Sequence, residues 1–177
     1  MRRIAQLIGF ELEWQQPNIL KMEYNLNAGD ELAATLRFRS AFGTLATGES
    51  SDGCWTFKRV GFFRTKVTIR DCGSDLDIAA FKDNTWSGGG TLELPDGRKF
   101  LATTNFWQTR FDIKTDTGET LIHFASGGVM RLSATVTIEP QAANLPELPW
   151  MVMLGWYLMV MMHMESASAV AVTTTVV

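Results

Sequence analysis

Residues 150–164 read WMVMLGWYLMVMMHM and contain no Asp, Glu, Lys or Arg. Met and Leu favour a helix, and Glu147 and Pro149 suit its first turn, so we predict a helix over residues 147–164. The predicted helix is apolar on every side and has no polar stripe. Such a helix has to be surrounded, because one sheet covers one side of it and leaves the rest in water.

Three environments can surround this helix: a bilayer, another subunit, or a sheet closed around it. The segment Trp150–Met162 lacks charged residues and is 13 residues long, which corresponds to about 20 Å of helix. The hydrocarbon core of a bilayer is about 30 Å thick and needs about 20 residues. The segment is short for a span. We therefore predict burial inside a barrel, and a membrane span remains the alternative.

From about Ile19 to Ile138, apolar and polar residues alternate with a period of two, which is typical of strands with one buried face. The longest run places Leu132, Ala134, Val136 and Ile138 between polar neighbours. Turn sequences rich in Gly, Asp and Asn separate the runs at the spacing of an antiparallel meander. We predict a mainly β fold, a closed antiparallel barrel of about twelve strands, which is wide enough to enclose the C-terminal helix.

The composition indicates one globular domain. The chain has 177 residues, of which 46% are hydrophobic, and its net charge is −3 from 16 basic and 19 acidic residues. These values exclude a disordered chain, a coiled coil and a basic nucleic-acid-binding protein. No composition break divides the chain, so we predict a single domain over residues 1–165 and a frayed tail over residues 166–177.

The N-terminal segment does not resemble a secretory signal, because Gln6, Glu11 and Glu13 interrupt its short apolar stretch. We therefore predict a cytoplasmic protein. In that compartment Cys54 and Cys72 are expected to be reduced thiols, and a Cys54–Cys72 cross-link remains the alternative.

The order of strands before a terminal helix that begins at Trp150, together with a hairpin from Trp55–Arg59 to Val67–Asp71, resembles one superfamily. It unites Tubby C-terminal domains, phospholipid scramblases and LURP-one-related proteins, and the resemblance covers nearly the whole chain. It implies a barrel around the C-terminal helix. Tubby domains bind phosphoinositide headgroups on the outer surface of the barrel, scramblases act at membranes with calcium, and LURP-one relatives mostly have no assigned activity. Residues 141–145 read QAANL where scramblases have their acidic calcium segment, so the resemblance predicts no calcium site here.

The candidate site is a run of basic residues without an acidic one between Cys54 and Arg70. Its members are Lys58, Arg59, Arg64, Lys66 and Arg70, and Phe62 and Phe63 occupy the predicted hairpin tip. A basic residue near an anionic leaflet contributes about 1 kcal/mol, and apolar tip residues can enter the membrane interface. The alternative is an ordinary surface whose cations pair with acids on neighbouring strands.

We thus expect a non-enzymatic cytoplasmic module, peripheral to membranes, that binds anionic phospholipid headgroups or a protein partner on the barrel exterior. The alternative is a scramblase-like protein whose C-terminal helix inserts in the bilayer. No catalytic residues, cofactor or metal site are predicted, because the two histidines, His123 and His163, are isolated. The aromatic residues Trp14, Trp55, Trp86 and Trp107 are expected in the core or at the barrel rim, so no nucleic-acid partner is predicted.

Overall fold

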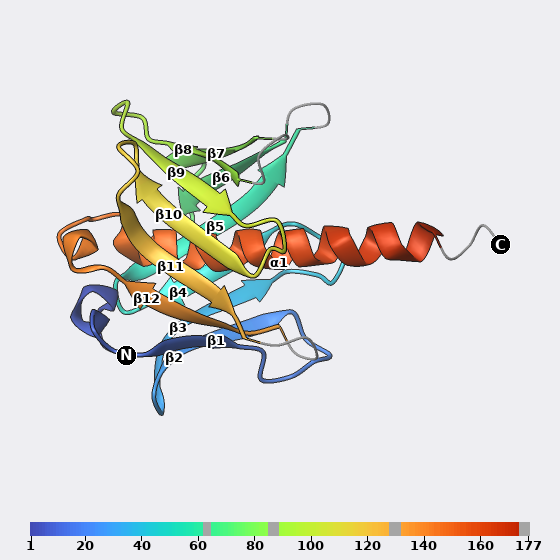
Figure 1. Cartoon of the computed structure of the whole chain (residues 1–177), viewed down its shortest axis with the longest axis horizontal. Helices are drawn as coiled ribbons and strands as arrows, with labels where there is room; N and C mark the ends of the chain where they lie inside the picture. Colours follow the sequence, from blue (N-terminus) through green and yellow to red (C-terminus); the bar gives the residue numbers. More distant parts are fainter. Residues whose placement is uncertain (62–64, 85–88, 128–131, 174–177) are drawn as a thin grey trace.

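Twelve strands close into an antiparallel barrel around one C-terminal helix, which confirms the predicted fold class (Figure 1). The computed structural model describes residues 1–61, 65–84, 89–127 and 132–173, with side chains up to residue 167. The strands are β1 (Leu12–Gln15), β2 (Glu23–Ala28), β3 (Glu31–Phe38), β4 (Ala46–Ser50), β5 (Gly53–Val60), β6 (Lys66–Asp71), β7 (Ala79–Asn84), β8 (Gly89–Glu93), β9 (Lys99–Thr104), β10 (Arg110–Thr115), β11 (Thr120–Ser126) and β12 (Ala134–Ile138).

Each strand pairs with the next one in the chain, and β12 pairs with β1 to close the barrel through Leu12 opposite Val136. The predicted alternation is present along the strands. In β2, for example, Tyr24, Leu26 and Ala28 are buried and alternate with half-buried polar residues. The inward-facing side chains therefore line a continuous apolar interior, which is the surface that the helix needs.

The helix α1 (Leu148–Thr173) runs through this interior. The apolar side chains from Trp150 to Met161 are each 8% exposed or less. Trp156 stacks on Trp14 of β1 with 5.7 Å between ring centroids, and Tyr24 of β2 meets its edge. The helix apolar on every side is thus surrounded by strand side chains rather than by lipid.

The helix is longer than predicted. It continues to Thr173, through most of the segment that we expected to fray. The small residues Ser166 and Ala167 are exposed, beyond the buried part of the helix. A helix that is already nucleated adds one hydrogen bond per residue, so the rigid part inside the barrel extends it past the last strand contact.

Two short 3-10 helices and an ion pair hold the beginning of α1. The helix η1 (Ile4–Leu7) buries Ile4 and Leu7 against the core, and η2 (Pro140–Ala142) leads from β12 into the helix. Glu147, which is 7% exposed, accepts a hydrogen bond of 2.5 Å from Arg98. This bond and the Asp96 carboxylate raise the pKa of the Arg98 guanidinium, so the guanidinium stays charged.

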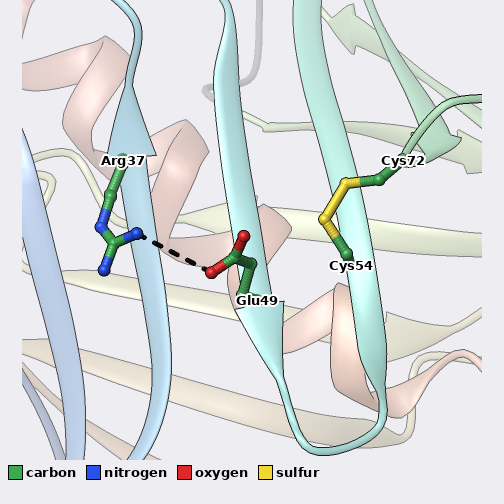
Figure 2. Close-up of a disulfide and its surroundings, with 4 residues drawn as sticks. All are labelled: Arg37, Glu49, Cys54 and Cys72. Carbon is green, nitrogen blue, oxygen red and sulfur yellow. Dashed lines mark ion pairs between the residues drawn. A yellow bond between two sulfur atoms is a disulfide. The ribbon is translucent and has the colours of Figure 1, made fainter.

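The prediction of reduced thiols is wrong, because Cys54 and Cys72 form a disulfide. The register of β5 and β6 places Trp55 opposite Asp71, so the next position brings Cys54 opposite Cys72, with 5.4 Å between the Cα atoms. Figure 2 shows the bond beside the Arg37–Glu49 ion pair of β3 and β4. The hairpin geometry, rather than the compartment, brings the sulfurs together.

We expect the double substitution Cys54→Ser and Cys72→Ser to lower the free energy of unfolding. The bond joins residues 18 positions apart, and a cross-link over a loop of that size contributes about 3 kcal/mol, mainly by restricting the unfolded chain. Urea unfolding of the variant and of the wild type measures the difference, and a reductant should lower the wild-type melting temperature in the same way. If the reductant leaves the wild-type melting temperature unchanged, the two thiols are free in solution.

Candidate functional site

The barrel has two unlike ends. In an antiparallel barrel alternate connections lie at the same end, and α1 leaves through one of them (Figure 1). We call this the exit end, whose described connection residues are 16–22, 39–45, 61, 65, 105–109, 127 and 132–133. The remaining connections and residues 1–11 form the opposite end, where α1 begins.

Charge is divided between these two ends. The described residues of the exit-end connections contain no Asp or Glu, and their basic residues are Lys21 and Arg39. The sequence between the same strands adds Arg64 and Arg131, which lie outside the described residues, and no acidic residue. The connections of the opposite end and residues 1–11 contain three arginines, Arg2, Arg3 and Arg98. Their acidic residues are Glu11, Asp30, Asp52, Asp75, Asp77, Asp96, Asp116, Glu119, Glu139 and Glu147. The connections are therefore basic at the exit end and acidic at the opposite end, and the exit end also carries the exposed carboxylates of Asp83 on β7 and Glu165 on α1.

Two of the predicted site residues extend this basic end along the outer wall. Lys58 of β5 and Lys66 of β6 are exposed and face outward near the exit end. Within the part of the chain that the structure describes, no carboxylate lies within ion-pair distance of either ammonium group. For these two lysines the interpretation as ordinary paired surface residues does not hold.

Lys66 also lies directly opposite another cation, Lys82 of β7. Like charges in opposing positions of a sheet repel each other, which is destabilising. Lys82 is neutralised by Glu93 of β8 at 2.5 Å, and this hydrogen bond, with help from Lys99, lowers the pKa of the Glu93 carboxyl. Lys66 has no such partner among the described residues, so its charge is available to an external anion.

The other predicted site residues behave differently. Arg59 faces the barrel interior and forms an ion pair with Glu165 of α1, where the helix leaves the barrel. Arg70 lies toward the opposite end of the hairpin and pairs with Asp77 at 2.6 Å and Asp75 at 4.0 Å, as the surface interpretation predicts. Arg64, Phe62 and Phe63 lie outside the described residues. The structure thus places Lys58, Lys66 and Arg70 on one outward face, with Lys58 opposite Thr68. Of these three, Arg70 is paired with carboxylates, whereas Arg59 faces the interior.

A cavity of about 220 Å³ opens beside α1 at the exit end. Its apolar side includes Phe81, Phe111 and Met161, and its polar side includes the Arg59–Glu165 pair and Gln108. Nearby, the Tyr157 hydroxyl donates a hydrogen bond of 2.7 Å to the Thr44 carbonyl oxygen, and burial raises the pKa of Tyr157 to about 12. The phenol therefore stays protonated and ties the helix to the β3–β4 connection.

Sequence reasoning missed the apolar side chains of the exit end. Ile19, Leu20, Phe42, Phe106 and Trp107 are exposed on three of its connections. The expectation that the tryptophans lie in the core or at the rim is confirmed for the three described ones, because Trp14 and Trp55 are buried and Trp107 is at the rim. Trp86 lies outside the described residues. The sequence did contain a signal for these residues. Alternate connections of an antiparallel meander lie at the same end, so apolar residues in alternate connections are expected to gather there.

The described residues contain one histidine–carboxylate pair on the outer wall. His123 of β11 lies opposite Asp112 of β10, and its Nδ1 contacts the Asp112 carboxylate, which Lys114 also approaches at 3.7 Å. No hydrogen bond joins His123 to a hydroxyl or thiol group in this part of the chain, so it contains no Ser-His-Asp or Cys-His arrangement. No group of three or more His, Cys, Asp or Glu residues positioned to hold a metal occurs within the described ranges.

Among the helices of the described residues, none has both the length and the apolar character needed to cross a bilayer. A scan against protein-family models finds no match for this chain, and no curated protein and no solved structure matches it. The likeness to the Tubby, scramblase and LURP-one superfamily therefore stays a prediction.

Proposed function

We propose that this protein is a non-enzymatic module that attaches peripherally to membrane surfaces rich in anionic phospholipids. One observation carries the proposal: the division of charge between a basic exit end and an acidic opposite end. A molecule polarised in this way is oriented by a negative surface, which attracts one end and repels the other. The proposed headgroup-binding site is therefore the exit end rather than the side of the barrel, and Lys58 and Lys66 lie at the border of this site.

The peripheral mode is favoured over the scramblase-like alternative. Insertion of the whole helix into a bilayer requires α1 to leave the barrel, and its residues from Trp150 to Met161 form the centre of the core. Withdrawal of the helix would leave the inward faces of the strands without their partner, which is comparable to unfolding. Attachment through the exit end leaves this packing intact.

We expect the double substitution Lys58→Glu and Lys66→Glu to weaken binding to anionic vesicles about 30-fold, because each lysine near an anionic surface contributes about 1 kcal/mol. Cosedimentation with vesicles of phosphatidylcholine and phosphatidylserine at low salt measures the affinity, and vesicles of phosphatidylcholine alone serve as the neutral reference. Binding should weaken as salt rises, since screening shortens the reach of exposed charges to about 10 Å at 0.1 M.

The matched control changes the same number of charges at the opposite end, with Arg3→Glu and Lys99→Glu. Both side chains are exposed there, so the net charge changes equally, and affinity for anionic vesicles should stay close to that of the wild type. Equal losses in both double variants would indicate a response to net charge rather than to an oriented site. A wild type that does not bind anionic vesicles at low salt would refute the proposal, and a protein partner would then become the favoured candidate.

The cytoplasmic location predicted from the sequence does not fit the Cys54–Cys72 disulfide, and the redox state of this pair in cells tests that location. Structural disulfides persist in oxidising compartments and are rare in the cytosol. Protein extracted from cells with its thiols blocked at lysis should carry Cys54 and Cys72 as thiols if the protein is cytoplasmic. A cross-linked pair at that point would instead place the protein in an oxidising compartment.

A further inference from the structure

The exit end displays large apolar side chains to water. The exposed fractions are 89% for Leu20, 100% for Phe42, 88% for Phe106 and 78% for Trp107. These residues come from three separate connections that topology gathers at one end of the barrel. Large apolar side chains exposed on several connections of one end mark a surface that another molecule covers.

One of these connections is built to hold its aromatic side chains outward. In the β9–β10 connection the Asn105 side-chain oxygen accepts hydrogen bonds from the backbone of Thr109 at 2.8 Å and Arg110 at 3.0 Å. Gln108 adopts a left-handed φ of 54°, and its backbone nitrogen donates to the Asn105 carbonyl oxygen. Because these hydrogen bonds already order the turn, binding through the rings of Phe106 and Trp107 costs little conformational entropy of the backbone.

We infer that Leu20, Phe42, Phe106 and Trp107 enter the boundary between headgroups and acyl chains of an anionic bilayer, with the barrel standing on its exit end. The inference rests on the proposed function and adds an insertion surface to it. The connections at this end contain no Asp or Glu, so their insertion desolvates no carboxylate, and Glu165 of α1 at the same end is paired with Arg59. Trp is enriched at this depth of the membrane, where an apolar ring and a polar N–H are both accommodated.

Charge argues against a second copy of the chain as the molecule that covers this surface. Two exit ends facing each other would bring Lys21, Arg39, Lys58 and Lys66 of both copies together, with no acidic residue in either set of connections. Juxtaposed like charges disfavour association. An anionic bilayer matches both the apolar side chains and the cations around them.

The test uses the full chain with Trp86→Phe, so that Trp107 is the one tryptophan among the described residues that is not buried. Vesicles of phosphatidylcholine and phosphatidylserine with brominated acyl chains quench tryptophan on contact. We expect quenching on binding, and its loss when Trp107→Phe is added. The triple substitution Leu20→Ser, Phe42→Ser and Trp107→Ser should weaken binding at least about 100-fold, because each large side chain loses its burial in the membrane.

The matched control is Phe10→Ser with Leu76→Ser, which removes exposed apolar side chains of the opposite end and should leave binding unchanged. Binding without quenching, together with a triple variant that binds like the wild type, overturns the insertion and leaves the proposed function standing. Failure of the wild type to bind anionic vesicles at all overturns both. A wild-type dimer that the triple variant turns into a monomer, with no quenching by vesicles, assigns the surface to a second copy and also overturns the insertion.

Discussion

Substitution of Trp156 by Asp is expected to unfold the barrel. Trp156 is 0% exposed in the buried N-terminal part of α1 and packs on Trp14 and Tyr24. Loss of a buried Trp side chain costs about 3–5 kcal/mol, and an unpaired carboxylate at the same place adds several kcal/mol more. The sum is comparable to the whole stability of a domain, about 5–15 kcal/mol. Loss of the near-ultraviolet circular dichroism signal and of a cooperative melt measures the outcome.

The same change outside the barrel provides the control. Ser166 lies on the same helix and is exposed, so Ser166→Asp should melt like the wild type. Leu154, two residues before Trp156, is 1% exposed, so Leu154→Asp should behave like Trp156→Asp. A cooperative melt of Trp156→Asp at the wild-type temperature would contradict the burial of the helix inside the barrel.

The second large effect is expected at Gly155, where the helix passes close to Phe124 of the barrel wall. A Cβ atom at this position would lie 2.3 Å from Cζ and 2.5 Å from Cε2 of Phe124 on β11. Phe124 is itself fully buried and packs against Phe111, so its ring has little room to move. We expect Gly155→Leu to lower the free energy of unfolding by at least about 4 kcal/mol, since not even the first side-chain carbon fits.

Helix propensity acts in the opposite direction at Gly155, because replacing Gly in a helix gains about 1 kcal/mol. The overpacking is larger, so the net effect remains destabilising, and a thermal melt should show a decrease of roughly 10–15 °C. The double variant Gly155→Leu with Phe124→Ala exchanges volume across the contact and should be more stable than the sum of the single effects by at least about 2 kcal/mol. Strict additivity of the two substitutions would show that these residues do not touch.

The fold could be predicted because its two signals are local. Alternation along the strands and a helix without a polar side are properties of residues a few positions apart. Burial of the helix required a closed barrel, and the barrel required the helix. The interior of a barrel of about twelve strands is too wide for strand side chains alone to fill. The length of α1 could not be read in the same way, because the Ser and Ala residues after Glu165 favour neither fraying nor helix strongly enough to decide it.

The disulfide was not predicted because the expected cytoplasmic location favoured reduced thiols, although the hairpin pattern placed the two cysteines side by side. The predicted hairpin already contained the register that sets Trp55 opposite Asp71, and one further step sets Cys54 opposite Cys72. The candidate site was predicted in part for a related reason. Successive side chains of a strand point to opposite faces of the sheet. Lys58 therefore points outward, whereas its neighbour Arg59 points inward to Glu165.

The exposed apolar side chains escaped notice because turns are recognised by Gly, Asp and Asn. Residues 29–30, 51–52 and 116–119 at the opposite end consist largely of such residues, whereas the connections with Leu20, Phe42 and Trp107 also contain large apolar residues. The amino-acid order alone determined a closed barrel filled by its own terminal helix, since both follow from side-chain periodicity. Only the tertiary arrangement decided that cations and apolar loop residues share one end and acids the other, because closing the barrel brings together connections that lie far apart along the chain.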